Sequence, residues 1–169
     1  MKCLSKQSMK KIKNIIGCIV VVLVTSCAVS NEARAYKKNI DGNWVLQSIT
    51  TEGVMGKINV QLFNEQDQNC FVGTRWNFNK SNSLGNYIID KTDKGCTPIK
   101  RNFRWSIFEP KGEPKQFQFK RVNEKYKTTD NGEGFRFTMS QLDKSNMQLK
   151  SNITFENKTV WIVYNFVRP

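Results

Sequence analysis

The sequence has no histidine among its 169 residues. This absence excludes Ser-His-Asp and Cys-His catalysis, imidazole-ligated zinc and His-ligated haem. The carboxylates that lie close to Pro or Gly in predicted turns are better explained by turn formation than by acid–base catalysis; they are Glu109, Glu113, Asp130 and Glu133. A cation loop over residues 130–133 is the other interpretation of the last two, and a hairpin turn is preferred. We therefore expect neither an enzyme nor a bound cofactor or metal.

The sequence also lacks an apolar run long enough to cross a bilayer, which takes roughly 20 residues. The run from Ile15 to Val24 is much shorter than that, and five lysines precede it. A basic segment, a short apolar segment and then small residues such as Thr25 and Ser26 are typical of a signal peptide. We expect residues 1–26 to be a leader that is removed by cleavage.

The sequence Leu-Val-Thr-Ser-Cys that ends at Cys27 resembles the lipobox of bacterial lipoproteins. The resemblance implies that the leader is cut just before Cys27 and that this cysteine carries two or three acyl chains such as palmitate, which suffice for a stable membrane anchor. Cys18 follows a similar Ile-Ile-Gly sequence, but a cut there would leave almost no apolar segment, so Cys27 is preferred. The alternative is an ordinary secretory leader with a cysteine at its end.

No aspartate follows Cys27 directly, and no acidic run lies behind it. The resemblance to lipoproteins then implies an anchor in the outer membrane, with the protein facing the periplasm. Residues 27–39 are mostly small and polar, so we expect a flexible lipidated tether there. The folded domain is expected over residues 40–169.

Acidic residues are scarce: there are 14, against 27 Lys and Arg. Five of the basic residues and none of the acidic ones lie in the leader, which leaves the mature chain with a net charge of +8. This surplus attracts anionic lipid headgroups, lipopolysaccharide phosphates or an acidic protein, unless it serves only to keep an anchored domain soluble. Nucleic acid is not expected as a partner outside the cytoplasm.

Only two cysteines, Cys70 and Cys96, remain once the leader is removed and Cys27 is acylated. A single pair in an oxidising compartment predicts a disulfide. The bond would stabilise the fold by roughly 3 kcal/mol through its effect on the unfolded chain. A zinc site has no further ligands to complete it, and the pair lacks the CxxC spacing of redox motifs.

No stretch has a sustained helical period, whereas apolar and polar residues alternate repeatedly along the chain. The alternation predicts eight strands with one apolar face each, over residues 43–50, 71–78, 84–90, 102–108, 116–122, 134–142, 147–155 and 159–167. Eight such strands close naturally into an antiparallel up-and-down barrel, so the expected fold class is all-β. The long connection 51–69 is expected to form a lid-like loop or a short helix over one mouth.

The tripeptide from Gly42 to Trp44 is similar to the Gly-x-Trp signature on the first strand of lipocalins. The resemblance implies that Trp44 plugs the closed end of the barrel and that Arg168, after the last strand, packs across its ring. Residues 70–76 with the later cysteine also resemble bacterial lipocalin-like lipoproteins. The resemblance covers about residues 40–169, but the second lipocalin motif, Thr-Asp-Tyr, is not evident, which favours a divergent bacterial branch.

Lipocalins typically hold small apolar ligands, so the resemblance implies a lipid or similar hydrophobic molecule inside the barrel. The side chains expected to line such a cavity are Trp76, Phe78, Phe103, Trp105, Phe117, Phe119, Phe135, Phe137 and Tyr164. The same large rings would alternatively fill the barrel as an ordinary core. In that case we expect a lipid-anchored module that acts through its loops and basic surface on an envelope protein or an anionic glycan, as an inhibitor or accessory factor.

Overall fold

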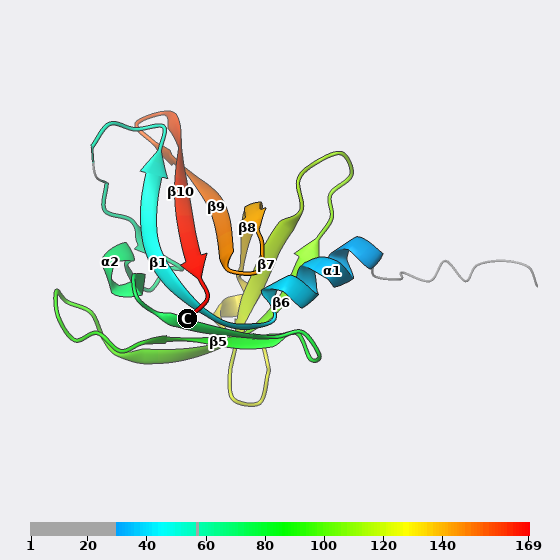
Figure 1. Ribbon diagram of the computed structural model, residues 1–169. Helices are drawn as coiled ribbons and strands as arrows, with labels where there is room; N and C mark the ends of the chain where they lie inside the picture. The colour runs from blue at the N-terminus through cyan, green and yellow to red at the C-terminus, as the bar shows by residue number, and fades with distance from the viewer. Residues whose placement is uncertain (1–29, 57) are drawn as a thin grey trace, which may run out of the picture.

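Eight antiparallel strands form one closed barrel in the computed structural model, which describes residues 30–56 and 58–169 (Figure 1). Each barrel strand pairs with the next one along the chain, and β1 also pairs with β10, which closes the ring. The strands are β1 Gly42–Glu52, β4 Arg75–Asn79, β5 Leu84–Ile89, β6 Ile99–Phe108, β7 Gln116–Val122, β8 Gly134–Leu142, β9 Asn146–Phe155 and β10 Lys158–Val167. The predicted up-and-down barrel is confirmed.

The other elements are short and lie outside the barrel sheet. They are α1 Asn31–Ile40, a hairpin of β2 Gln61–Leu62 and β3 Gln66–Asp67, α2 Gln68–Phe71 and the 3₁₀ turn η2 Asp130–Gly132. Among the described residues, none of the helices is long and apolar enough to cross a membrane. The predicted leader, residues 1–26, and the predicted acylation site Cys27 lie outside the described residues.

Strand β6 shows how alternation builds the core. Phe103 and Trp105 are buried inside the barrel, whereas Arg104 between them is exposed. Successive side chains of a strand point to opposite faces of a sheet, so the barrel strands place one set of large apolar side chains inside. Each fully buried ring stabilises the fold by about 1.5–3 kcal/mol relative to exposure, which makes the interior the main source of stability.

The expected flexible tether, residues 27–39, is helical from Asn31 onward. Ser30 caps α1, because its Oγ accepts a hydrogen bond of 2.9 Å from the backbone N–H of Ala33. The helix buries Ala33 and Ile40 and lies against β6 and β8 (Figure 1). The prediction of a flexible tether is therefore wrong for the helical part of this segment. The segment has too few apolar residues for its sequence to indicate the amphipathic helix that it forms.

The long connection 51–69 contains the β2–β3 hairpin and the start of α2. The strand expected over 71–78 begins only at Arg75, because α2 continues to Phe71 and the chain then turns at Gly73. Gly73 has a φ of +89°, a conformation that glycine adopts without the strain of a side chain.

Cys70 in α2 and Cys96 in the loop before β6 form a disulfide, with their Cα atoms 5.5 Å apart. The predicted pairing is confirmed. The bond joins α2 to the loop between β5 and β6, so the end of the long connection is held covalently to the barrel.

Gly42, Trp44 and Arg168 lie together at the end of the barrel where β1 begins and β10 ends. The Trp44 ring is fully buried, its Nε1 donates a hydrogen bond of 2.7 Å to the carbonyl of Ile40, and the Arg168 guanidinium lies 4.3 Å from the ring centroid. A Cβ on Gly42 would stand 2.9 Å from the Arg168 side chain, and the φ of Gly42 is +108°. The backbone conformation therefore favours glycine at this position, and a larger residue would also displace the end of the Arg168 side chain.

We expect Trp44→Ala to lower the free energy of unfolding by about 3–5 kcal/mol, because the lost ring leaves a cavity. Arg168→Ala should cost less, and the double variant should cost about 1 kcal/mol less than the sum, because the cation–π contact is removed only once. Urea unfolding of the four proteins measures this coupling. A coupling near zero would show that the two residues contribute independently.

Candidate functional site

The predicted cavity residues do lie inside the barrel, but they fill it. Eight of the nine are less than 5% exposed, and Phe135 is half-buried. The space left among these rings is about 10 Å³, close to the minimum that a single water molecule requires. The interior therefore has no room for a lipid or another small organic ligand in this conformation.

Phe63, for which the alternation of the sequence predicts no interior position, completes this packing. It comes from the turn between β2 and β3, and its ring is buried. Its centroid lies 5.1–6.3 Å from the centroids of seven other rings, those of Phe71, Trp76, Tyr87, Phe119, Phe135, Phe137 and Tyr164. A side chain from outside the barrel sheet thus occupies the place that an apolar ligand would need.

The turn that carries Phe63 has an unfavourable backbone. Phe63 and Asn64 both have a φ of +54°, and the N–H of Glu65 donates a hydrogen bond of 2.9 Å to the carbonyl of Leu62. Asn tolerates the left-handed region, whereas a bulky residue such as Phe is held there at a cost of about 1–3 kcal/mol. Burial of the Phe63 ring offsets this strain.

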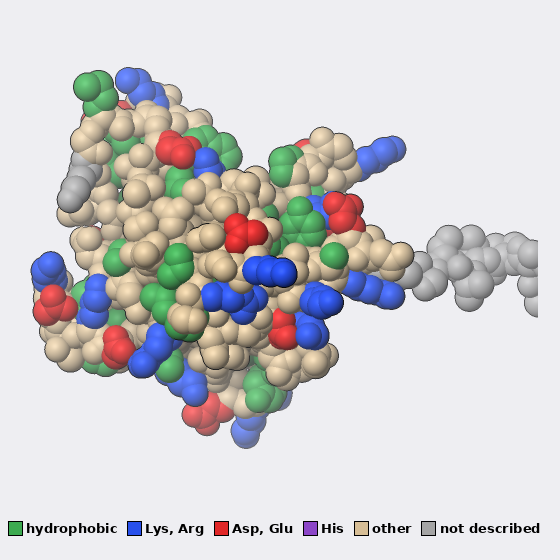
Figure 2. Space-filling model, in the orientation of Figure 1, with side chains coloured by type: hydrophobic (Ala, Val, Ile, Leu, Met, Phe, Trp, Pro, Cys, Tyr) green, Lys and Arg blue, Asp and Glu red, His purple; other side chains and the backbone are tan. Residues whose placement is uncertain are grey.

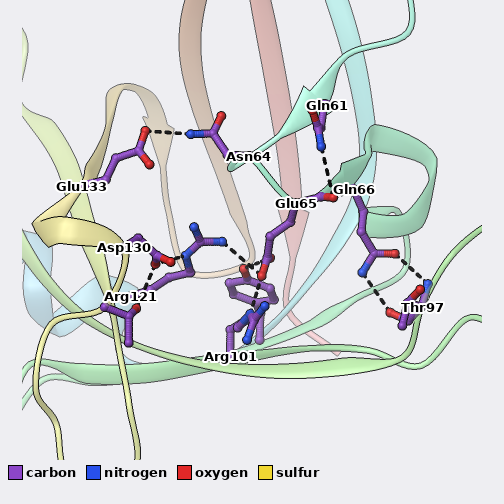
Figure 3. A network of polar contacts seen from close by, with 11 residues as sticks. Gln61, Asn64, Glu65, Gln66, Thr97, Arg101, Arg121, Asp130 and Glu133 are labelled. Carbon is purple, nitrogen blue, oxygen red and sulfur yellow. Dashed lines mark hydrogen bonds and ion pairs between the residues drawn. The ribbon is translucent and has the colours of Figure 1, made fainter.

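A network of charged side chains holds the turn in place (Figure 3). The buried Glu65 carboxylate accepts a hydrogen bond from Arg101 Nε and lies 3.0 Å from Arg121 Nη1. Arg121 Nε in turn donates to Asp130 Oδ2 at 2.7 Å. Two carboxylates and two guanidinium groups thus neutralise one another, as buried charges require.

Tyr87 completes the coordination of Glu65, because its hydroxyl donates to Glu65 Oε2 at 2.5 Å. Burial and the neighbouring carboxylate raise the pKa of Tyr87 well above its ordinary value, so the phenol stays protonated and remains a donor. The hydrogen bond from Thr129, together with Arg121, holds the pKa of Asp130 below its usual range. With Tyr87, Arg101 and Arg121 all directed at Glu65, this carboxylate serves to fix the turn.

Two further contacts fasten the same turn at its sides (Figure 3). Asn64 Nδ2 donates to Glu133 Oε1 at 2.8 Å, before β8. The Gln66 side chain forms two hydrogen bonds with the backbone of Thr97, next to the disulfide. The Phe63 turn is thus held from the β5–β6 loop, from β6 and β7, and from the β7–β8 connection.

A separate hollow of about 800 Å³ lies on the outer face of β6, β7 and β8. We call it the outer groove; its charged lining residues are Lys37, Arg104, Lys120 and Arg136. No Asp or Glu lines it, and within the described part of the chain none of the four cations lies within 4 Å of a carboxylate. Figure 2 shows Lys and Arg side chains gathered over and beside α1, which carries Lys37.

Strand register brings the groove's cations together. Arg104 of β6 and Lys120 of β7 are directly opposite partners, and on the other side Lys120 faces Gly134 of β8, which has no side chain. Like charges directly opposite each other destabilise a sheet. Because no described carboxylate pairs with Arg104 or Lys120, their repulsion would be relieved by an anion bound between the two side chains.

Polar groups continue the lining along the strands. Arg136 Nη2 donates to Gln118 Oε1 at 3.1 Å, and Gln118 Nε2 donates to Ser106 Oγ at 2.8 Å. Lys37 Nζ donates to Ser83 Oγ at 2.8 Å. The groove thus combines cationic and polar side chains with apolar ones such as Val122 and Tyr126, whereas the interior is almost entirely apolar.

Comparisons of the chain with protein-family models, with curated proteins and with solved structures gave no significant match. The eight-stranded closed antiparallel barrel is consistent with a lipocalin-like fold. The contact of Arg168 with Trp44 is the one that the resemblance implies.

We expect Phe63→Ala to lower the free energy of unfolding by about 3–5 kcal/mol, because the ring leaves a cavity among seven others. Phe63→Leu should cost less, and Phe155→Ala, at an exposed position, should cost well under 1 kcal/mol. The cavity should also admit benzene, so benzene should raise the Tm of the Phe63→Ala variant and leave the wild type unchanged. A wild-type barrel stabilised equally by benzene would show that its interior is open.

Proposed function

We propose that the protein is a lipid-anchored binding protein of the bacterial cell envelope, in which a filled lipocalin-like barrel serves as a rigid scaffold and the outer groove binds an anionic partner. The observation that carries this proposal is the contrast between the two spaces. The interior leaves about 10 Å³, whereas the outer groove offers about 800 Å³ lined by four cations and no acid.

A small apolar ligand inside the barrel would require Phe63 to leave its place. That movement would break seven ring contacts and expose the Glu65 network to water. Exposing the ring alone costs about 1.5–3 kcal/mol, and separating the buried charges costs more. An apolar ligand would have to exceed both costs before it gained any affinity, so the interior is better explained as a core.

The groove's chemistry matches a phosphate, sulfate or carboxylate group. A guanidinium such as that of Arg104 binds these groups through two parallel hydrogen bonds, and the Lys120 ammonium adds a point charge. In the unbound protein Arg104 and Lys120 repel each other. An anion between them removes this repulsion, and this relief contributes to the free energy of binding. The net charge of +8 on the mature chain draws anions toward the surface from a distance.

Binding accounts for the groove better than catalysis does. Four hydroxyl-bearing residues line it, and no Asp or Glu is among the described lining residues; they are Ser83, Ser106, Tyr126 and Thr128. The hydroxyls of Ser83 and Ser106 accept hydrogen bonds from Lys37 and Gln118. A hydroxyl nucleophile needs an adjacent general base. We therefore assign no enzymatic activity to the groove.

The proposed location at the membrane depends on acylation of Cys27. In cells grown with an alkyne analogue of palmitate, the wild-type protein and the Cys18→Ala variant should both be labelled, and the Cys27→Ala variant should not. In-gel detection of the labelled protein measures this. Label that persists in Cys27→Ala and disappears in Cys18→Ala would move the anchor to Cys18.

We expect the outer groove to bind a soluble polyanion, with heparin as the probe. For the protein purified from its membrane in a non-ionic detergent, the double change Arg104→Gln and Lys120→Gln should weaken heparin binding about tenfold or more, or by about 1.4 kcal/mol. Lys91→Gln with Lys158→Gln removes the same charge elsewhere on the surface and should have a much smaller effect. Isothermal titration calorimetry at fixed ionic strength measures both, and equal losses in the two variants would contradict the proposal.

A further inference from the structure

We infer that the outer groove binds the anionic headgroups of the membrane that carries the lipid anchor, so that the barrel lies against this membrane with the outer face of β6, β7 and β8. This inference rests on the proposed function and names the partner of the same site. Three observations support it: the short length of chain between Cys27 and the groove, the fixed orientation of α1 on the barrel, and the aromatic and basic side chains at the rim of the groove.

The groove lies close to the proposed anchor. Asn31, where α1 begins, is the fourth residue after Cys27, and four residues of chain reach at most about 14 Å. Lys37, which lines the groove, lies six residues further along the helix, a rise of about 9 Å. If Cys27 carries the anchor, the edge of the groove is held within about 25 Å of the acylated residue.

Helix α1 is fixed to the barrel at both ends, which sets its orientation. At its start, Ser30 Oγ donates to Glu109 Oε2 at 2.6 Å, and Glu32 pairs with Lys115 at 2.6 Å. Toward its end, Lys37 donates to Ser83, and the buried Ile40 carbonyl accepts from the Trp44 indole. A flexible tether would leave the barrel free to turn in any direction. A docked helix keeps the groove on the side from which the anchor comes.

The rim of the groove carries exposed aromatic rings beside basic residues. Tyr126 is 54% exposed, and Lys125 and Lys127 are its neighbours in the β7–β8 connection, which has Glu124 as its nearest acid. Phe108 is 38% exposed at the end of β6, with the Arg136 guanidinium 4.5 Å from its ring centroid. Aromatic rings beside Lys and Arg are typical of side chains at the headgroup level of a bilayer.

Anchoring also favours headgroups over a soluble anion energetically. Each Lys or Arg near an anionic leaflet adds to the attraction. The groove and its rim bring together six such residues, Lys37, Arg104, Lys120, Lys125, Lys127 and Arg136. Because the anchor already holds the protein at the surface, binding to headgroups is intramolecular and does not require a second encounter. The hollow shape of the groove suits individual headgroups, whose phosphates would enter between Arg104 and Lys120.

Tryptic cleavage of the membrane-anchored protein tests this inference. The acylated full-length mature protein is reconstituted into vesicles of phosphatidylcholine alone, or of phosphatidylcholine with phosphatidylglycerol, and cleavage after each Lys is followed by mass spectrometry. We expect cleavage after Lys125 and Lys127 to be at least fivefold slower on the anionic vesicles. Cleavage after Lys94, in the β5–β6 loop, should be the same on both and serves as the internal control. High salt, which shortens the Debye length to about 3 Å at 1 M, should remove the protection.

Variants of the groove show whether the groove causes the protection of Lys125 and Lys127 against trypsin. Arg104→Gln with Lys120→Gln should abolish it on anionic vesicles, and Lys91→Gln with Lys158→Gln should leave it intact; unchanged cleavage after Lys94 shows that each variant is folded. Equal cleavage on both kinds of vesicle, or equal loss in both variants, overturns the inference. If the groove then still binds heparin, the proposed function stands with a soluble anionic glycan as the partner; if heparin binding fails as well, the proposed function falls too.

Discussion

The packing of the Phe63 ring among seven other aromatic rings decides what this barrel can do. Without that ring the interior would be a cavity lined by aromatic side chains, the arrangement expected of a carrier of apolar molecules. With it, the interior is a filled core that leaves about 10 Å³ of space, and the proposed binding site lies on the outside. The position of one side chain from a connecting turn therefore separates the two functions that the amino-acid sequence allows.

Phe63 stays in place because several weak features of its turn support one another. The left-handed backbone at Phe63 and Asn64 is unfavourable by itself, and a buried Glu65 is unfavourable by itself. Together, the ring fills the barrel, Arg101 and Arg121 compensate the carboxylate, and the Cys70–Cys96 disulfide fixes the end of the same connection. Removal of this turn would leave a cavity inside the barrel and would leave Arg101 and Arg121 without the Glu65 carboxylate.

The sequence was sufficient for the barrel and the disulfide, because alternation over eight strands and a single cysteine pair each have one simple structural solution. It was insufficient for α1, because the only buried apolar residues of this helix are Ala33 and Ile40, within a mostly polar segment. It also gave no sign that Phe63 enters the barrel, since a single apolar residue in a long connection has no periodicity. The outer groove arises from the pairing of Arg104 with Lys120, and alternation alone shows which face a residue occupies but not which residue lies opposite it.

A crystal structure of the protein purified from its own host tests most directly whether the barrel is filled. We predict that the Phe63 ring occupies the interior, that Glu65 contacts Arg101 and Arg121, and that no electron density for a bound molecule lies inside the barrel. Density for an apolar molecule among Trp76, Phe119 and Tyr164, with the β2–β3 turn displaced, would contradict it and make the interior the binding site.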